Sequence, residues 1–393
     1  MPRFEPFAGI RYAPEIDLAA VTSPPYDVID GTEREALAAS EPRNAVHVDC
    51  PVGGLGAGGE GTAAGADAYQ AAASTFESWL AEGALVVDDR PSFTLYRMSF
   101  TDERGRPRST TGVIGALTLE RPGEGNVLPH ERTTPKARSD RLDLLRATRA
   151  NLSAVWGLSL ADGLSKLLDP PGAALGAFED PDGVRHEAWR IDDPEACAAI
   201  SVAVGIAPVV IADGHHRYET SIAYRDEIGD AVPGADAILA LVVELSDDQL
   251  TVQPIHRLLS GLPEDFDLLD ALAGAYDVDR ADDAAATDEL AVLTQEGRFR
   301  LRPRRSARLE TEYLDAALAT FPPHQIAYQH GTANVVDALR SGRAQAGVLL
   351  RPVTVAQIAE VADARDRMPP KTTFFWPKPR TGIVFRSLGG GTG

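Results

Sequence analysis

One short turn of the sequence carries the residue types that phosphoryl chemistry needs: Asp213-Gly214-His215-His216-Arg217. It joins an apolar run, residues 207–212, to a helical pattern, residues 215–228. A glycine turn between a strand and a helix leaves backbone N–H groups and the positive end of the helix dipole available to an anion. Arg217 adds a bidentate donor, the histidines can donate to or protonate phosphoryl oxygens, and Asp213 could bind Mg²⁺ or orient a hydroxyl group. The turn therefore predicts a phosphate-binding site.

Two other interpretations of this turn are open. Asp213 could serve only as a helix cap, because Asp is a preferred residue at that position. His215 and Glu219 share one helical face and could bind zinc, but adjacent histidines point apart and the sequence supplies no third ligand at a metal-binding spacing. Phosphate binding accounts for all the polar residues of the turn together, and we therefore prefer it.

Two further polar segments could complete such a site. Residues 128–136 contain Pro129-His130-Glu131-Arg132 ahead of a helical pattern, although a charged turn of this kind can equally be a solvated loop. Residues 368–378 contain Lys371-Thr372-Thr373 after two prolines, and these three residues offer an ammonium group, two hydroxyls and backbone N–H groups to phosphate oxygens.

Lysine is rare in this chain, which draws attention to the second of these segments. Only four residues among the 38 Lys and Arg are lysine, and two of them, Lys371 and Lys378, fall within one stretch of eight residues. The sequence has no G-x-x-x-x-G-K-[ST] pattern, so a phosphate would be held by these segments and not by a P-loop.

The elements that must position these residues follow from periodicity and from turn residues. Helices are expected at 32–40, 67–82, 138–150, 194–204, 215–228 and 355–364. Strands are expected at 92–100 and 110–119, which form a hairpin, and at 153–160, 184–191, 207–212 and 236–245. Residues 45–48 could also be a strand, but the glycine-rich run that follows them lacks the context of a dinucleotide site.

These elements predict a mixed α+β protein of several domains, because 393 residues exceed one ordinary core. Residues 1–125 form an N-terminal α+β region, and residues 126–250 form a core that contains the Asp213–Arg217 turn. Residues 251–340 form a smaller inserted lobe, and residues 341–393 return to complete the phosphate site.

Composition narrows the class of protein. A formal charge of −20 makes nucleic acid an unexpected partner, because binding to a phosphate backbone needs a basic face. Cys50 and Cys197 are far apart, which suits a reducing compartment, and we expect a cytoplasmic protein. The sequence shows no export signal or membrane-spanning segment, and it leaves a homodimer open.

Four blocks of the sequence together resemble a known family. They are Pro24-Pro25-Tyr26-Asp27-Val28-Ile29, His130-Glu131-Arg132-Thr133, Ala212 to Arg217, and Met368 to Lys378. In this order they resemble the bacterial domain of unknown function 1015 family, and the resemblance covers essentially the whole chain. The name of that family implies no activity.

A second resemblance does imply one. Pro129-His130-Glu131, the Asp213–Arg217 turn and Pro370-Lys371-Thr372-Thr373 occur in the same order in archaeal free serine kinases of the ParB/sulfiredoxin-like superfamily. This resemblance covers about residues 126–240 and 340–385 and implies a ParB/sulfiredoxin-like catalytic core. It implies that Glu131 is the base on the serine hydroxyl, that the turn holds phosphate and metal, and that Lys371 to Thr373 contact nucleotide phosphates.

The expected function is therefore transfer of a phosphoryl group from ATP or ADP to free L-serine, or to a similar small hydroxylated metabolite, with Mg²⁺ as cofactor. The catalytic residues expected are Glu131, Asp213, His215 and His216, with Asp213 also the metal ligand. The phosphate- and nucleotide-binding residues expected are His130, Arg132, Gly214, Arg217, Lys371, Thr372 and Thr373. A ParB-like regulator that binds or hydrolyses nucleotide, and a non-catalytic protein, are the alternatives.

Overall fold

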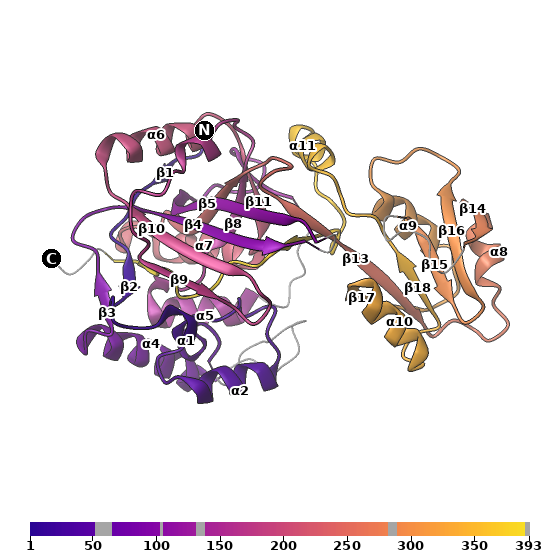
Figure 1. The fold of residues 1–393 in the computed structure, drawn as a ribbon, viewed down its shortest axis with the longest axis horizontal. Helices are drawn as coiled ribbons and strands as arrows, with labels where there is room; N and C mark the ends of the chain where they lie inside the picture. Colours follow the sequence, from indigo (N-terminus) through magenta and orange to yellow (C-terminus); the bar gives the residue numbers. More distant parts are fainter. Residues whose placement is uncertain (52–64, 103–104, 131–137, 282–288, 390–393) are drawn as a thin grey trace. The chain divides into compact units, whose positions relative to one another are not determined.

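The computed structural model describes residues 1–51, 65–102, 105–130, 138–281 and 289–389 (Figure 1). The chain divides into two compact units. The first unit comprises residues 1–250 together with 377–393, and the second unit comprises Thr251–Trp376. Residues from the N-terminal region and from the region after residue 126 therefore share one unit.

A nine-stranded sheet forms the centre of the first unit, in the order β6-β11-β8-β12-β5-β4-β10-β9, with β1 paired to β5. Its strands are β1 Phe4–Glu5, β4 Phe93–Thr101, β5 Pro107–Thr118, β6 Val127–Pro129, β8 Val155–Ser159, β9 Gly176–Glu179, β10 Arg185–Ile191, β11 Val209–Asp213 and β12 Ala237–Glu244. Strands β8 and β12 are buried along nearly their whole length, which explains why both are continuous apolar runs. The predicted hairpin is present as β4 and β5, with Thr94 opposite Ile114.

Helices cover both faces of this sheet. Figure 1 shows α6 on one side and α2 and α4 on the other. The α-helices of the unit are α1 Leu18–Val21, α2 Gly31–Ser40, α3 Val46–Asp49, α4 Ala66–Ala81, α5 Arg138–Thr148, α6 Pro194–Gly205 and α7 His215–Ile228. The short 3₁₀ turns are η3 Ser165–Leu167 and η4 Gly229–Ala231.

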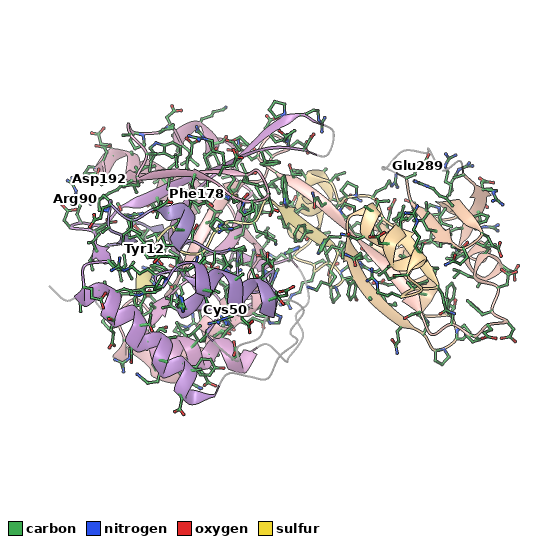
Figure 2. The ribbon with its side chains drawn as sticks, turned by 60° about the horizontal axis from the view of Figure 1, so that its bottom comes forward. Tyr12, Cys50, Arg90, Phe178, Asp192 and Glu289 are labelled. Atoms are coloured by element: carbon green, nitrogen blue, oxygen red, sulfur yellow. The ribbon has the colours of Figure 1, made fainter. Side chains whose placement is uncertain are left out.

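The first unit also contains two small two-stranded sheets. One pairs β2 Ile10–Tyr12 with β3 Leu85–Val87, and the other pairs β7 Ala150–Asn151 with β20 Arg386–Ser387. Tyr12, labelled in Figure 2, packs against Trp79 of α4 and against Phe385. The C-terminal segment is thus part of the core of the first unit.

The segment considered as a strand at residues 45–48 is instead helical, in α3. The side-chain oxygen of Asn44 accepts from the N–H of Val46, and its amide nitrogen donates to the carbonyl of Ala20 at 2.7 Å. This anchored turn starts a helix and overrides the strand preference of Val46 and Val48. The glycine-rich run that follows lies outside the described residues.

The second unit contains its own seven-stranded sheet, in the order β14-β16-β15-β18-β13-β17, with β19 paired to β13. The strands are β13 Thr251–Ser260, β14 Tyr276–Arg280, β15 Ala291–Thr294, β16 Gly297–Pro303, β17 Gln325–His330, β18 Ala346–Leu349 and β19 Thr373–Trp376. The helices are α8 Leu268–Ala273, α9 Glu310–Leu318, α10 Thr332–Arg340 and α11 Val355–Asp363. Leu259, Val292, Leu314 and Val348 are completely or almost completely buried and belong to its core.

The mixed α+β class predicted from the sequence is confirmed. Helices predicted at 138–150, 194–204 and 215–228 are α5, α6 and α7, with ends that differ by two residues at most. Within the described ranges, no helix has both the length and the apolar character needed to cross a membrane.

Candidate functional site

The Asp213–Arg217 turn lies where β11 leaves the sheet. Strand β11 runs parallel to β6 and antiparallel to β8, and its register with β8 shifts between Ile211 and Asp213. Gly214 follows with a φ of +84°, in the left-handed region, and is the N-cap of α7. A Cβ atom at Gly214 would lie 3.0 Å from the guanidinium of Arg217, so glycine is favoured here by its left-handed conformation and by this tight contact.

Asp213 lies between two cations. Its Oδ1 is 3.3 Å from Nζ of Lys378, and its Oδ2 is 3.4 Å from Nη2 of Arg217. Burial alone would raise the pKa of this carboxyl group, but Lys378 and Arg217 outweigh burial and lower the pKa to about 2. Asp213 is therefore a carboxylate at any physiological pH.

Arg217 is buried and links the turn to other parts of the first unit. Its Nη1 donates to the main-chain oxygen of Ala154, and its Nη2 lies 4.0 Å from Oδ2 of Asp27. The guanidinium also lies 5.8 Å from the ring of Tyr26. Burial would lower the pKa of Arg217, but Asp27 and Asp213 raise it overall, so the side chain stays charged.

Two histidines meet beside the turn. Nδ1 of His130, at the end of β6, is 2.6 Å from the carbonyl oxygen of Ile211 and 3.0 Å from Nε2 of His215. Because a carbonyl oxygen only accepts, Nδ1 of His130 carries the proton, and His215 accepts through Nε2. Burial lowers the pKa of His130 to about 4 and, together with the proximity of His130, lowers that of His215 well below its ordinary value.

The structure thus brings together several residues that the sequence singled out. His130, Asp213, Gly214, His215 and Arg217 form one cluster at the start of α7, and the half-buried His216 follows directly in the helix. Glu131 and Arg132 lie outside the described residues.

The second unit carries the Pro-Lys-Thr-Thr loop. Lys371 is exposed, has a φ of +58°, and accepts through its main-chain oxygen from Nη1 of Arg257 at 2.9 Å. The hydroxyl of Thr372 is buried and donates to the main-chain oxygen of Pro369 at 2.7 Å. Thr373 begins β19, opposite Pro254. The Thr372 and Thr373 side chains are thus buried in the second unit.

Three residues next to this cluster, Lys378, Tyr26 and Asp27, are not among the site residues expected from the sequence. In the sequence, Lys378 stands out only as one of the rare lysines, and Tyr26 and Asp27 only as part of the Pro-Pro-Tyr-Asp block. The rarity of lysine was a signal for Lys378. Nothing local in the sequence connects Asp27 to Arg217, since almost two hundred positions separate them.

Asp213 is the metal ligand expected from the sequence. Among the described residues, no group of three or more His, Cys, Asp and Glu side chains is arranged to hold a metal ion. Mg²⁺ in phosphoryl-transfer sites is usually held by one or two carboxylates together with substrate phosphates and water. The single ionised carboxylate of Asp213 fits a Mg²⁺ ion that is held mainly by substrate phosphates and water. It does not fit a metal ion held by protein ligands alone.

The model of the family described as "Protein of unknown function (DUF1015)" matches residues 4–325, and the chain belongs to that family. This confirms the first resemblance. A comparison with curated proteins found no significant match.

Solved structures similar to this chain include a free serine kinase in complex with AMP, which is 14% identical, with a TM-score of 0.37 and a match that covers 66% of this chain and 88% of that one. A conserved hypothetical protein from Pyrococcus furiosus is 14% identical, with a TM-score of 0.36 and coverage of 66% and 90%. SbnI with a C-terminal truncation, from Staphylococcus aureus, is 10% identical, with a TM-score of 0.40 and coverage of 69% and 85%. At these TM-scores the likeness carries no inference about activity.

Proposed function

We propose that the chain is a nucleotide-dependent kinase that phosphorylates the hydroxyl group of free L-serine, or of a similar small hydroxylated metabolite. One observation carries the proposal: the cation–carboxylate–cation arrangement of Lys378, Asp213 and Arg217 lies at the start of α7, whose N-cap is a glycine. The order of the motifs, which resembles that of free serine kinases, supports the same function.

The phosphoryl group would be held at the beginning of α7. The first turn of a helix has N–H groups without an intrahelical acceptor, and within the described residues no side chain makes a capping hydrogen bond to this one. Lys378 and Arg217 add positive charge within 3.5 Å of Asp213. Fixed donors and cations of this kind stabilise the charge on a transferring phosphoryl group.

Proton transfer from the acceptor hydroxyl needs a different group. Asp213, with a pKa of about 2, is too weak a base at neutral pH. His130, with a pKa of about 4, is neutral at that pH and uses its Nδ1 proton to bond Ile211. The resemblance assigns the base to Glu131, which follows His130 directly, and we retain that assignment as part of the proposal.

Mg²⁺, when bound, would offset the negative charge of the nucleotide phosphates. Asp213 would be its protein ligand, and its low pKa keeps it ionised for that role. Lys378 and Arg217 both contact Asp213, so each holds the carboxylate in place and would lie close to the same phosphates.

The experiment is direct. Purified protein is incubated with Mg²⁺, L-serine and either ATP or ADP, and O-phosphoserine is measured by mass spectrometry. We expect product with one of the two nucleotides, and we expect Glu131→Gln to lower turnover by at least 100-fold while nucleotide affinity is kept. Lys166→Met, at an exposed lysine of the first unit, is the matched control and should keep full turnover.

The outcomes separate the alternatives. No product from either nucleotide with any small hydroxylated amino acid would refute the kinase function. Slow hydrolysis that does not depend on serine, with no phosphorylated product, would favour the ParB-like nucleotide-hydrolysing regulator. Failure of every nucleotide to raise the melting temperature would favour a non-catalytic protein.

A further inference from the structure

A series of hydrogen bonds links the β9 edge of the nine-stranded sheet to the C-terminal segment of the first unit. Nε2 of His186, in β10, lies 3.0 Å from Oδ2 of Asp180, the residue that follows β9. Nδ1 of His186 lies 2.7 Å from the hydroxyl of Tyr96, in β4. The main-chain N–H of Arg380, 284 positions further along the sequence, donates to the same hydroxyl at 3.1 Å. We call Asp180, His186 and Tyr96 the Tyr96 network.

The direction of each hydrogen bond in the Tyr96 network follows from the groups at its two ends. Burial lowers the pKa of His186, so the ring is neutral at pH 7 and has one N–H. A carboxylate oxygen only accepts, so this group is Nε2–H, which donates to Asp180. Nδ1 therefore accepts from the hydroxyl of Tyr96, and the hydroxyl oxygen is left to accept from Arg380. Every donor in the series thus faces an acceptor.

The Tyr96 network is shielded from solvent. Tyr96 is 1% exposed and His186 is 0% exposed. The ring of His186 stacks on Tyr96, with 5.9 Å between the centroids, and on Phe178, with 5.0 Å between them; Phe178 is labelled in Figure 2. Groups enclosed in this way are not open to a substrate. They act instead on the protein segment that they contact, which begins at Pro377.

This segment carries a lysine of the candidate phosphate site. Its sequence is Pro377-Lys378-Pro379-Arg380, so the hydrogen bond from the main chain of Arg380 lies two residues from Lys378. The two prolines fix φ on both sides of Lys378, and Pro379 also restricts the backbone of Lys378 to extended conformations. With so few free dihedral angles, the position of residue 380 largely sets the position of Lys378, whose Nζ lies 3.3 Å from Oδ1 of Asp213.

Other hydrogen bonds attach the segment to a different part of the first unit. Nη2 of Arg380 donates to the main-chain oxygen of Thr22 at 2.9 Å. Thr381 exchanges two main-chain hydrogen bonds with Ser23, at 2.8 and 3.1 Å. These bonds hold the segment against the residues that follow α1. The hydroxyl of Tyr96 attaches it to the nine-stranded sheet, whose strand β11 carries the carboxylate of the phosphate site.

We propose that the Tyr96 network positions Lys378 for contact with nucleotide phosphates, which makes Tyr96 a positioning residue of the proposed reaction. The inference rests on the proposed function, because it takes the start of α7 as the phosphate site. Without the hydroxyl, the N–H of Arg380 loses its acceptor, and the segment is no longer fixed to the sheet at that point. A charge-assisted contact depends on its geometry, so a displaced Nζ binds phosphate less well.

A double-mutant cycle tests the coupling between Tyr96 and Lys378. The affinities for ADP and ATP, with Mg²⁺, are measured by isothermal titration calorimetry on the wild type, Tyr96→Phe, Lys378→Met and the double variant. Phenylalanine keeps the ring and removes only the hydroxyl, so we expect Tyr96→Phe to weaken the nucleotide about fivefold. The double variant should bind no more weakly than Lys378→Met alone, because the side chain that Tyr96 positions is already gone.

Tyr12→Phe is the matched control. Tyr12 is buried in the same unit, and its hydroxyl also makes a main-chain hydrogen bond, to the oxygen of Arg43 at 2.7 Å. Tyr12→Phe and Tyr96→Phe should lower the melting temperature to a similar extent, but only Tyr96→Phe should weaken the nucleotide. A purely structural role of Tyr96 would change the melting temperature alone.

A conservative variant tests the part played by His186. The side-chain amide of asparagine ends about where Nδ1 of histidine lies, so His186→Asn keeps an acceptor for the hydroxyl of Tyr96, whereas His186→Leu has none. His186→Asn should retain more of the nucleotide affinity than His186→Leu. Equal affinities in these two variants would contradict the role of the histidine.

The outcomes of the cycle separate this inference from the proposed function. If Lys378→Met weakens the nucleotide and Tyr96→Phe does not, the inference is wrong and the phosphate site stands. The same holds if Tyr96→Phe weakens the nucleotide equally in the presence and absence of Lys378. If Lys378→Met itself leaves the affinity unchanged, the phosphate site and the inference both fail.

Discussion

The Asp213–Arg217 turn of the first unit and the Pro369–Thr373 loop of the second unit are both expected from the sequence to bind phosphate, but their residues are held in different ways. In the turn, charged side chains pair with Asp27 and Lys378, which come from opposite ends of the sequence. In the loop, the hydroxyl of Thr372 donates to the main chain only three residues back. The charged side chains of the turn therefore depend on the folding of the whole unit. The loop combines its local hydrogen bond with one from Arg257, 114 positions away, to the main-chain oxygen of Lys371.

Two segments that are both expected to bind phosphate can therefore differ in how much a substitution in them changes the stability of the protein. Buried charges that rely on distant partners are costly to disturb, because removal of one partner leaves the other uncompensated. Exposed charges on a local loop contribute little to stability. The predictions below test this contrast, beginning with the largest effect.

Arg217→Met should cause the largest loss of stability. The substitution removes the cation from Asp27 and Asp213 and leaves the main-chain oxygen of Ala154 without its donor, so we expect the free energy of unfolding to fall by about 3–5 kcal/mol. Lys371→Met, at the exposed lysine of the loop, should change it by less than about 0.5 kcal/mol. Urea unfolding of both variants measures the difference, and equal losses would contradict the contrast.

His130→Asn should make the free energy of unfolding depend less on pH in the acid range. Burial lowers the pKa of His130 to about 4 in the native state, against an ordinary value of about 6.5 in the unfolded chain. Between these values the unfolded state binds the extra proton, so stability rises with pH, and the wild type loses on the order of 3 kcal/mol on this account as the pH falls from 7 to 4. The variant should lose the share of this pH dependence that comes from His130, as measured by urea unfolding between pH 4 and pH 7.

His256 supplies the matched comparison in the second unit, since burial lowers its pKa to about 4 as well. His256→Asn should flatten the acid dependence in the same way, but only His130→Asn should also weaken nucleotide binding. An unchanged pH dependence in His130→Asn would show that this histidine is not neutral in the native protein.

Gly214→Ala and Lys371→Gly should act in opposite directions, because both positions have left-handed backbone but only one holds glycine. Alanine at 214 should lower the free energy of unfolding by about 1–2 kcal/mol because of the left-handed conformation. Its Cβ atom would also lie only 3.0 Å from Arg217. Glycine at 371 adopts the left-handed conformation without strain, so we expect the free energy of unfolding to rise by less than about 1 kcal/mol. Thermal unfolding measures both, and a stabilising Gly214→Ala would contradict the geometry of the turn.

The sequence predicted the local structure of the site well. Gly214 and Gly229 flank the helical pattern of 215–228, and α7 has those limits. It could not predict that Asp213 pairs with Lys378, or that Asp27 approaches Arg217, because such pairs depend on how distant segments pack. The dependence on distant contacts also explains α3. There the hydrogen bond of Asn44 to Ala20 favours a helical turn, although valines prefer strands.

The most direct test of the account is the affinity of the chain for ADP and ATP, measured by isothermal titration calorimetry on the wild type, Lys378→Met and Lys166→Met. Both variants lose one of the four lysines, but only Lys378 contacts Asp213 at the start of α7. If the turn holds nucleotide phosphates, Lys378→Met should weaken the nucleotide at least tenfold and Lys166→Met should not change its affinity. The same affinity in all three proteins would contradict the assignment of the phosphate site to this turn.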